Sequence, residues 1–333
     1  MLIRTYNRAK LLKKCIESVL NTEFPKDNYE IIVGDGASND STQENMLDLI
    51  KKSKKFLNDY PHIYYFRDSE NLGLVRNILK PISFAKGKYI CLLDSDATVP
   101  KDWLKKVHDL MESKDLDLSG ASHLTYPEEG PLVGYDLGPF GEIVLPYRKN
   151  EPIFISGVNL FFKKSTFYKV GGLDPMIDYM SEDLDIALRV RFIGGKVMGN
   201  TNIVVDHTTI PTDEHLRAPN NIEKFVFRSV SRVIYTYLKD FEWRYGIKLA
   251  FRYFLIKTYD AFIELGKKNQ RVFIGYLKGI YWILLNFGII IKKHMRVKRL
   301  VKGSDILKKF LHQKSISIKK LIKNTFKKNQ IHL

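Results

Sequence analysis

The residues of this chain best suited to chemistry are carboxylates placed at the ends of apolar segments. Asp35 follows the segment IIVG, Asp94 and Asp96 follow YICLL, and Asp183 opens the helical segment LDIALRVRF. Because ligands of open α/β folds bind at the carboxyl ends of the strands, we expect these side chains to converge at one edge of a sheet. Such a group suits a divalent metal that holds a diphosphate, with one carboxylate left to act as a base.

Asp94-Ser95-Asp96 is the most specific of these motifs. At the end of a strand the side-chain alternation breaks down, so that both carboxylates can face one ligand, and hard oxygen ligands at this spacing suit Mg²⁺ or Mn²⁺. His207 follows Val204-Val205-Asp206, at the end of an apolar strand, and is either a further metal ligand or a packing residue. The histidines without such a position are treated as structural: His108, His123 and His215.

Three of the acidic residues have a structural alternative to a role in chemistry. Asp35, followed by small residues, could accept a hydrogen bond from a nucleobase or could cap the helix expected near Thr42. Glu182 and Asp183 stand in the first turn of a helix, where the exposed N–H groups favour acidic residues. In their case the two roles are compatible, because a carboxylate at a helix start can also deprotonate a hydroxyl in a cleft.

The elements that must position these residues follow from the apolar pattern. From Met1 to about Leu93, short apolar runs alternate with helical stretches, which predicts βαβ units and a mostly parallel sheet. Strands are expected at 30–33, 63–66, 89–93 and 197–206, and helices at 11–20, 42–56, 75–85, 102–111, 165–170 and 183–192. The first strand looks clipped, and either the start codon is misassigned or this edge of the sheet is weak. Short runs within residues 119–160 predict an antiparallel extension beside the cleft.

Charge divides the chain into two parts. The formal net charge is +17, yet residues 1–215 hold 27 Lys and Arg against 31 Asp and Glu, whereas the remaining 118 residues hold 27 against 6. The pattern predicts a catalytic domain at 1–214 and a basic helical extension at 215–333 that seeks lipid head groups, nucleic acid or another polyanion.

The most apolar stretch, residues 273–291, could insert into a membrane, dock at its surface or pack against the body of the protein, because Lys278 and Asn286 interrupt it. No signal peptide is visible after Met1. Cys15 and Cys91 show neither metal spacing nor a disulfide framework and are expected to be buried free thiols in a reducing compartment. We therefore expect a cytoplasmic protein.

Five motifs in order resemble the inverting family 2 glycosyltransferases of GT-A fold, and the resemblance covers about residues 1–210. They are IRTYNR at 3–8, DGASNDST at 35–42, ENLGLVRN at 70–77, GKYICLLDSDA at 87–97, and GGLDP through SEDLDIALRVRFIGG. The resemblance implies a nucleotide-sugar donor, Mn²⁺ or Mg²⁺ on its diphosphate, and direct displacement with inversion. It also implies a glycan or lipid-linked acceptor.

The resemblance assigns roles to particular residues. It places Thr5 and Tyr6 against the nucleobase, Asp35 on its imide edge and Arg76 near the nucleotide. On the metal side, Asp94 reaches the ribose or the metal, Asp96 binds the metal, and His207 matches a histidine after the last strand. On the acceptor side, Asp183 is the base and Glu182 orients the acceptor. The chain departs from the family pattern at Arg4, where a proline is common, and at residues 71–77, which look shorter than usual.

Three other readings remain open. A noncatalytic nucleotide-sugar or carbohydrate binding protein could keep the same fold. A nucleotidyltransferase usually needs a glycine-rich loop, which IRTYNRAK lacks. Nucleic-acid binding by the basic tail is disfavoured, because its aromatic residues recur at the spacing of a helix core.

The basic tail resembles extensions of family members that work at membranes, which implies peripheral attachment to the inner face of the cell membrane. The basic residues concerned are Lys292, Lys293, Arg296, Lys298, Arg299 and the cluster at 308–328. We therefore expect an anionic membrane surface, and no nucleic acid, as a partner. The sequence leaves the oligomeric state open.

Overall fold

The computed structural model describes residues 1–55, 60–124, 130–146, 150–207 and 221–311. The chain forms two compact units. The first comprises Met1–Tyr135, Pro146–Thr209 and Lys298–Val301, and the second comprises Asp136–Leu145, Ile210–Val297 and Lys302–Leu333. The domain boundary expected at residue 214 lies outside the described residues and stays a prediction.

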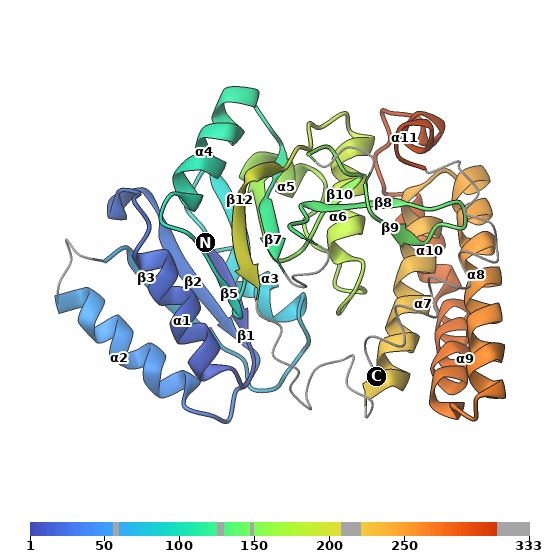
Figure 1. Cartoon of the computed structure of the whole chain (residues 1–333), viewed down its shortest axis with the longest axis horizontal. Coiled ribbons are helices and arrows are strands. Elements are labelled where there is room, and N and C mark those ends of the chain that lie inside the picture. The colour runs from blue at the N-terminus through green and yellow to red at the C-terminus, as the bar shows by residue number, and fades with distance from the viewer. Residues whose placement is uncertain (56–59, 125–129, 147–149, 208–220, 312–333) are drawn as a thin grey trace. The chain divides into compact units, whose positions relative to one another are not determined.

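The first unit is built on a six-stranded mixed sheet (Figure 1). Its order is β3 (His62–Arg67), β2 (Glu30–Asp35), β1 (Leu2–Thr5), β4 (Tyr89–Asp94), β11 (Asn159–Lys163) and β6 (Leu118–Ser119). The first four strands are parallel, and β11 runs antiparallel to both of its neighbours. The predicted α/β class with a mostly parallel sheet is therefore confirmed. The first strand does not form an edge, because β1 lies in the interior of the sheet, between β2 and β4.

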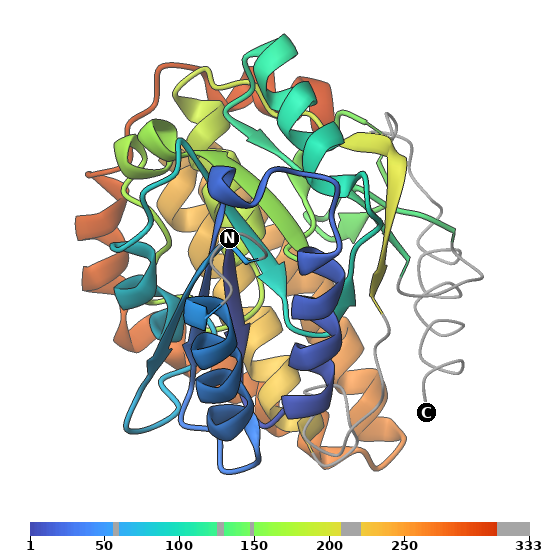
Figure 2. The same ribbon diagram turned by 90° about the vertical axis from the view of Figure 1, so that its left-hand side faces the viewer.

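Side-chain alternation divides this sheet into two apolar faces. Ile3, Val33 and Leu93 lie in register and share a core with α1 (Ala9–Leu20) and α4 (Trp103–Lys114). On the opposite face α3 (Arg76–Ile82) packs so closely that a Cβ added at Gly34 would lie 2.6 Å from the backbone oxygen of Asn77. Figure 2 shows α1 beside α2 (Thr42–Lys55), in blue.

Two smaller sheets complete the strands. In one of them β12 (Asn200–His207) pairs antiparallel with β5 (Ala97–Thr98) and parallel with β7 (Ala121–Leu124). The other has the order β10 (Phe154–Ile155), β8 (Gly134–Leu137) and β9 (Ile143–Val144), all antiparallel. Four of these strands, β7 to β10, lie within residues 119–160, where an antiparallel extension is expected; β8, β9 and β10 pair antiparallel, whereas β7 pairs parallel with β12.

The other helices complete the two units. The first unit also contains a 3-10 turn at Lys26–Asn28, α5 (Lys164–Lys169) and α6 (Glu182–Phe192). The second contains α7 (Ile222–Asp240), α8 (Trp243–Gly266), α9 (Gln270–Leu285), α10 (Phe287–His294) and α11 (Gly303–Phe310). Its core includes the fully buried aromatic side chains of Tyr235, Tyr237 and Phe241.

The apolar stretch at 273–291 does not form one straight helix. It spans α9 and α10, which meet at a bend of 60°. Among the described residues no single helix has the length and apolar composition to cross a membrane, and only this bent pair taken together does.

Candidate active site

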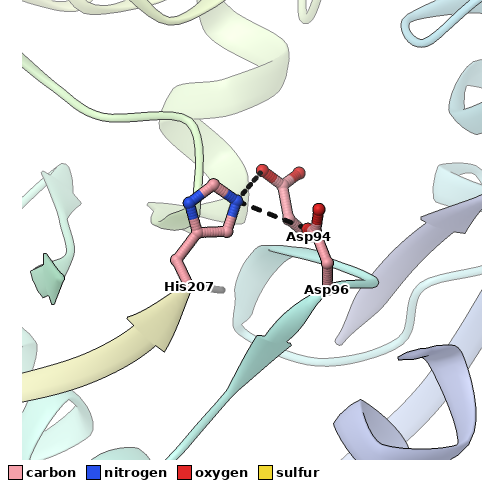
Figure 3. A group of neighbouring side chains, drawn as sticks. All are labelled: Asp94, Asp96 and His207. Atoms are coloured by element: carbon pink, nitrogen blue, oxygen red, sulfur yellow. Dashed lines mark ion pairs between the residues drawn. The ribbon is translucent and has the colours of Figure 1, made fainter. Parts of the chain in front are cut away.

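Asp94, Asp96 and His207 lie together at the carboxyl end of β4 (Figure 3). Asp94 ends β4, and the pairing of β12 with β5 sets His207 opposite Ala97, one residue after Asp96. The Nε2 atom of His207 is 3.3 Å from Oδ1 of Asp96 and 3.8 Å from Oδ2 of Asp94. One possible ligand atom from each residue lies within 4.8 Å of the other two.

Two arginines hold the opposite oxygens of these carboxylates. Nη2 of Arg4 lies 2.7 Å from Oδ1 of Asp94, and Nη1 of Arg8 lies 2.6 Å from Oδ2 of Asp96. Each carboxylate therefore gives one oxygen to an arginine and turns the other toward His207. Oδ1 of Asp96 is buried beside the His207 imidazole. Two hard oxygens and an imidazole nitrogen form a donor set that fits Mn²⁺ or Mg²⁺.

The charges of this group are strongly coupled. Burial alone would raise the pKa of Asp96, but hydrogen bonding to His207 and the charge of Arg8 lower it to about 2. Burial alone would lower the pKa of His207, but Asp96 and Asp94 outweigh it and raise that pKa. Because metal binding requires a neutral imidazole, a cation at this site would compete with the proton on His207.

Arg4 connects this group to the second acidic cluster. It is paired in register with Asp94 across β1 and β4, at the point where the strand order of the sheet reverses. Its Nη2 atom is also 3.9 Å from Oε1 of Glu182, at the start of α6. Arg4 therefore lies between Asp94 and Glu182, the neighbour of Asp183.

Asp183 is held by backbone donors in the first turn of α6. Oδ1 accepts a hydrogen bond from the N–H of Leu184 at 2.8 Å, and Oδ2 accepts one from the N–H of Gly157 at 3.1 Å. Burial and the charge of Glu182 raise the pKa of Asp183 to about 7. Burial also raises the pKa of Glu182, against the opposing charge of Arg4. A carboxylate with a pKa near neutrality is well suited to general base catalysis.

The segment before α6 has an unusual backbone. Met180 and Ser181 have φ values of +66° and +78°, in the left-handed region that non-glycine residues rarely adopt. Two such residues in succession store strain immediately before Glu182 and Asp183. Strain of this kind is concentrated at functional sites, where the surrounding structure maintains it.

The residues expected at the nucleotide are more dispersed. Asp35 is fully buried; Oδ1 accepts bonds from the N–H of Ser38 at 3.0 Å and its hydroxyl at 2.5 Å, and Oδ2 accepts one from the Tyr65 hydroxyl at 2.5 Å. Both carboxylate oxygens of Asp35 therefore accept hydrogen bonds from the protein itself. The role of Asp35 in binding a nucleobase stays a prediction.

The other three residues expected at the nucleotide lie at the end of β1, directly after it and at the start of α3. Thr5 is buried and pairs in register with Asp35, and Tyr6 is 39% exposed. Arg76 begins α3, is exposed, and donates from Nε to the backbone oxygen of Pro175 at 3.4 Å. Their contacts with a nucleotide stay predictions.

Several residues of the site were not identified from the sequence. Arg4 was noted only as a departure from the family pattern, and Arg8 was given no role. Arg4 lies in the first strand and Arg8 follows it closely, so the order of the strands, had it been known, would have set them beside Asp94 and Asp96. His123 of β7 is buried with its ring centroid 6.1 Å from that of His207. Burial and the charge of His207 lower the pKa of His123 to about 4.

Comparison with solved structures supports the fold. The mannosyltransferase PcManGT from Pyrobaculum calidifontis, solved with GDP-Man and Mn²⁺, superimposes with a TM-score of 0.55 over 84% of this chain and 86% of its own, at 14% identity. At this identity the likeness concerns the GT-A fold alone.

Sequence comparison identifies the family. A relative from Methanococcus voltae, a dolichyl N-acetyl-α-D-glucosaminyl phosphate 3-β-D-2,3-diacetamido-2,3-dideoxy-β-D-glucuronosyltransferase, is 33% identical over 241 residues, which cover 69% of this chain and 70% of the relative. An uncharacterized glycosyltransferase of Mycoplasma pneumoniae is 26% identical over 198 residues, 58% of this chain, which spans 64% of the length of that relative. The sequence profile of glycosyl transferase family 2 matches residues 1–171. The chain therefore belongs to glycosyl transferase family 2.

Proposed function

We propose that this protein is a metal-dependent, inverting glycosyltransferase that moves a sugar from a nucleotide-sugar donor to a hydroxyl of a glycan or lipid-linked acceptor. The observation that carries the proposal is the position of Arg4, which contacts both Asp94 and Glu182, the neighbour of the candidate base Asp183. The GDP-Man and Mn²⁺ of the Pyrobaculum complex support the donor and the metal. The dolichyl phosphate in the name of the Methanococcus relative supports a lipid-linked acceptor.

The residues have separate tasks in this proposal. Asp94, Asp96 and His207 would hold Mn²⁺ or Mg²⁺, which neutralises the negative charge that develops on the leaving diphosphate. Arg4 and Arg8 keep the two carboxylates turned toward His207. Asp183 accepts the proton of the acceptor hydroxyl, while the N–H groups of Gly157 and Leu184 fix the orientation of its carboxylate.

The remaining roles follow from the geometry of displacement. Glu182 orients the acceptor beside Asp183. A hydroxyl that attacks from the face opposite the leaving diphosphate inverts the anomeric carbon. Thr5, Tyr6, Asp35 and Arg76 complete the donor site in this proposal.

A ligand panel tests the donor and the metal. We expect one or more of the UDP, GDP, dTDP and CDP sugars to raise the melting temperature with Mn²⁺ or Mg²⁺ and much less with EDTA. Saturation at a hundred times Kd stabilises a protein by about 2.7 kcal/mol, which is several degrees. Asp96→Asn should lose the metal-dependent part of this shift. Asp109→Asn, an exposed aspartate of α4 paired with Lys105, should keep it.

Turnover separates this proposal from the noncatalytic alternative. We expect sugar transfer or slow donor hydrolysis with any nucleotide sugar that binds. A nucleotide sugar that stabilises the protein but is neither transferred nor hydrolysed would favour a binding protein of the same fold. A panel without any shift would contradict both.

We also propose that basic residues of the C-terminal region attach the protein to an anionic membrane. Lys292 and Lys293 lie in the last turn of α10, and Arg296, Lys298 and Arg299 follow the helix. Most of the cluster at 308–328 lies outside the described residues. This attachment is electrostatic and predicts vesicle binding that weakens as the NaCl concentration rises.

A further inference from the structure

The second unit exposes two apolar stripes on neighbouring helices. Each stripe recurs every three or four residues, so it occupies one side of its helix. The stripe residues are 40–67% exposed: Ile247, Phe251, Leu255, Tyr259 and Phe262 on α8, and Ile274, Leu277, Tyr281 and Leu284 on α9. These nine residues are called the α8–α9 face below.

The two stripes belong to one surface. The helices α8 and α9 are joined by Lys267-Lys268-Asn269 and pack together with α7 (Figure 1). Near the connection the ring centroids of Phe262 and Phe273 are 5.5 Å apart. At the other end of the pair a groove of about 220 Å³ opens between the helices. Its lining is entirely apolar: Ile234, Leu238, Ile247, Ala250, Phe251, Phe254, Ile280, Ile283 and Leu284.

The α8–α9 face has the features of an interaction surface. Contiguous exposed apolar patches of this kind usually mark interaction sites. Because these nine side chains are 40–67% exposed, covering them removes a large apolar area from water and favours association.

The helices that carry the α8–α9 face are basic, which favours an anionic partner. Residues 222–297 contain 15 Lys and Arg against 5 Asp and Glu. All five acidic residues are buried or half-buried. Three of them pair with lysines: Glu223 with Lys278, Glu264 with Lys267, and Asp260 with Lys257. The exposed basic side chains are Lys224, Arg244, Lys248, Lys267, Lys268, Arg271, Lys278, Lys292 and Arg296.

We infer that the α8–α9 face inserts into the hydrocarbon region of an anionic bilayer, with the surrounding basic side chains on the lipid head groups. An apolar helix face flanked by lysine and arginine has the pattern of an interfacial membrane surface. A second copy of the chain would bring two basic surfaces together. The C-terminal residues 312–333 hold six lysines and no acidic residue, so they too would be repelled from this face.

Insertion can be measured at a single position. We would replace Leu284, which is 67% exposed, by cysteine and attach an environment-sensitive fluorophore, because the native Cys15 and Cys91 are 0% and 3% exposed. Vesicles of equal parts phosphatidylglycerol and phosphatidylcholine should shift the emission of the label to the blue, and phosphatidylcholine alone should not. A label at Leu47→Cys, on an exposed apolar position of α2, should not respond.

Flotation of unlabelled protein provides the second measurement. Phe251→Glu should weaken binding to the anionic vesicles by tenfold or more, on the order of the loss of one buried aromatic side chain. Leu47→Glu is the matched control and should bind like the unaltered protein. Circular dichroism checks that each variant is folded, and the labelled Leu284→Cys protein decides the matter if Phe251→Glu is not.

Three outcomes would overturn the inference. Flotation without a change at the Leu284 label would mean that only the basic segments touch the membrane. Undiminished flotation of Phe251→Glu would mean that the α8–α9 face is not inserted. Dissociation of an oligomer by Phe251→Glu, without vesicle binding by the unaltered protein, would assign the face to a second copy. None of these measurements needs a sugar donor, so they are independent of the proposed transferase activity.

Discussion

At the scale of single residues, Arg4 determines how the two acidic clusters meet. Its side chain is only 12% exposed, and it faces Asp94 and Glu182, whose side chains are 22% and 11% exposed. A cation buried among carboxylates stabilises the fold mainly by preventing uncompensated charge. Removing this cation therefore destabilises the fold by more than the ion pair itself stabilises it.

Arg4→Met should lower the free energy of unfolding by about 2–4 kcal/mol, because it leaves two poorly solvated carboxylates without their cation. Urea denaturation at neutral pH measures this loss. Arg4→Lys should lose less, since an ammonium group can still pair with one carboxylate. Lys105→Met removes an exposed pair with Asp109 and should change stability by less than about 1 kcal/mol. Equal effects of Arg4→Met and Lys105→Met would contradict this account.

Asp183 should set the pH dependence of activity. With a pKa of about 7, its carboxylate is the working form, so kcat/KM should rise with pH and level off above about pH 7. Asp183→Asn should lower kcat by about 10²–10⁴ and remove this ionisation from the profile. Initial rates from pH 5 to 9 measure both effects. Unchanged turnover in Asp183→Asn would remove the base assignment.

The same ionisation predicts a change in stability that needs no substrate. Folding raises the pKa of Asp183 from 3.8 to about 7, so the folded state favours the protonated acid. The cost of ionising it therefore appears as the pH rises through this window and is complete above pH 7. Asp183→Asn does not ionise, so its melting temperature should improve relative to the unaltered protein between pH 5 and pH 8. A purely structural role in capping α6 would give a difference independent of pH.

At the scale of elements, strained turns hold the carboxyl edge of the sheet. Ala37, between Asp35 and Ser38, has a φ of +62°. Because glycine adopts this conformation without steric cost, Ala37→Gly should stabilise the protein by about 0.5–1 kcal/mol. Gly194→Ala is the matched reverse change, with a φ of +80° and no atom within 4 Å of the added Cβ, and should destabilise by a similar amount. Urea midpoints of the two variants should move in opposite directions, and movement in the same direction would contradict the argument.

The parallel part of the fold was predictable because its signals are local. The strands found at Glu30–Asp35, His62–Arg67 and Tyr89–Asp94 extend the predicted ones by one or two residues. The central strand Asn159–Lys163 was missed, because its apolar run NLFFK lies in a stretch rich in glycine and proline. Its pairing with β4 depends on long-range packing, which periodicity does not reveal.

The candidate metal ligands were predictable for a similar reason. Asp94, Asp96 and His207 each follow an apolar strand, and the structure brings them together, although metal binding itself stays a prediction. The partners Arg4 and Arg8 could not be assigned, because their contacts depend on which strands are neighbours and in what register. The same is true of Tyr65, whose hydroxyl bonds to Asp35 from the adjacent strand.

At the scale of the whole molecule, the candidate active site and the α8–α9 face are assigned to different units. Every residue of the candidate active site belongs to the first unit, and every residue of the α8–α9 face belongs to the second. Each unit has its own apolar core, the first around Trp103 and Phe161 and the second around Tyr235, Tyr237 and Phe241. Damage to one core should therefore leave the function of the other unit measurable.

Phe241→Ala tests this separation. Phe241 is fully buried, and its ring centroid lies 6.3 Å from that of Tyr237. Removing such a ring costs about 3–5 kcal/mol, so amide hydrogen exchange should accelerate in α7 and α8. Leu2→Ala, in the buried strand β1, is the reciprocal variant and should accelerate exchange in β1, β2 and β4.

The active site provides the second readout. Phe241→Ala should retain the proposed nucleotide-dependent and metal-dependent protection of the first unit, because none of the residues proposed to bind these ligands lies in α7 or α8. Leu2→Ala should weaken that protection. If Phe241→Ala instead accelerates exchange in β1 and β4 as much as in α7, the two cores unfold as one cooperative structure. The division of chemistry and association between the units would then hold for their residues but not for their stability.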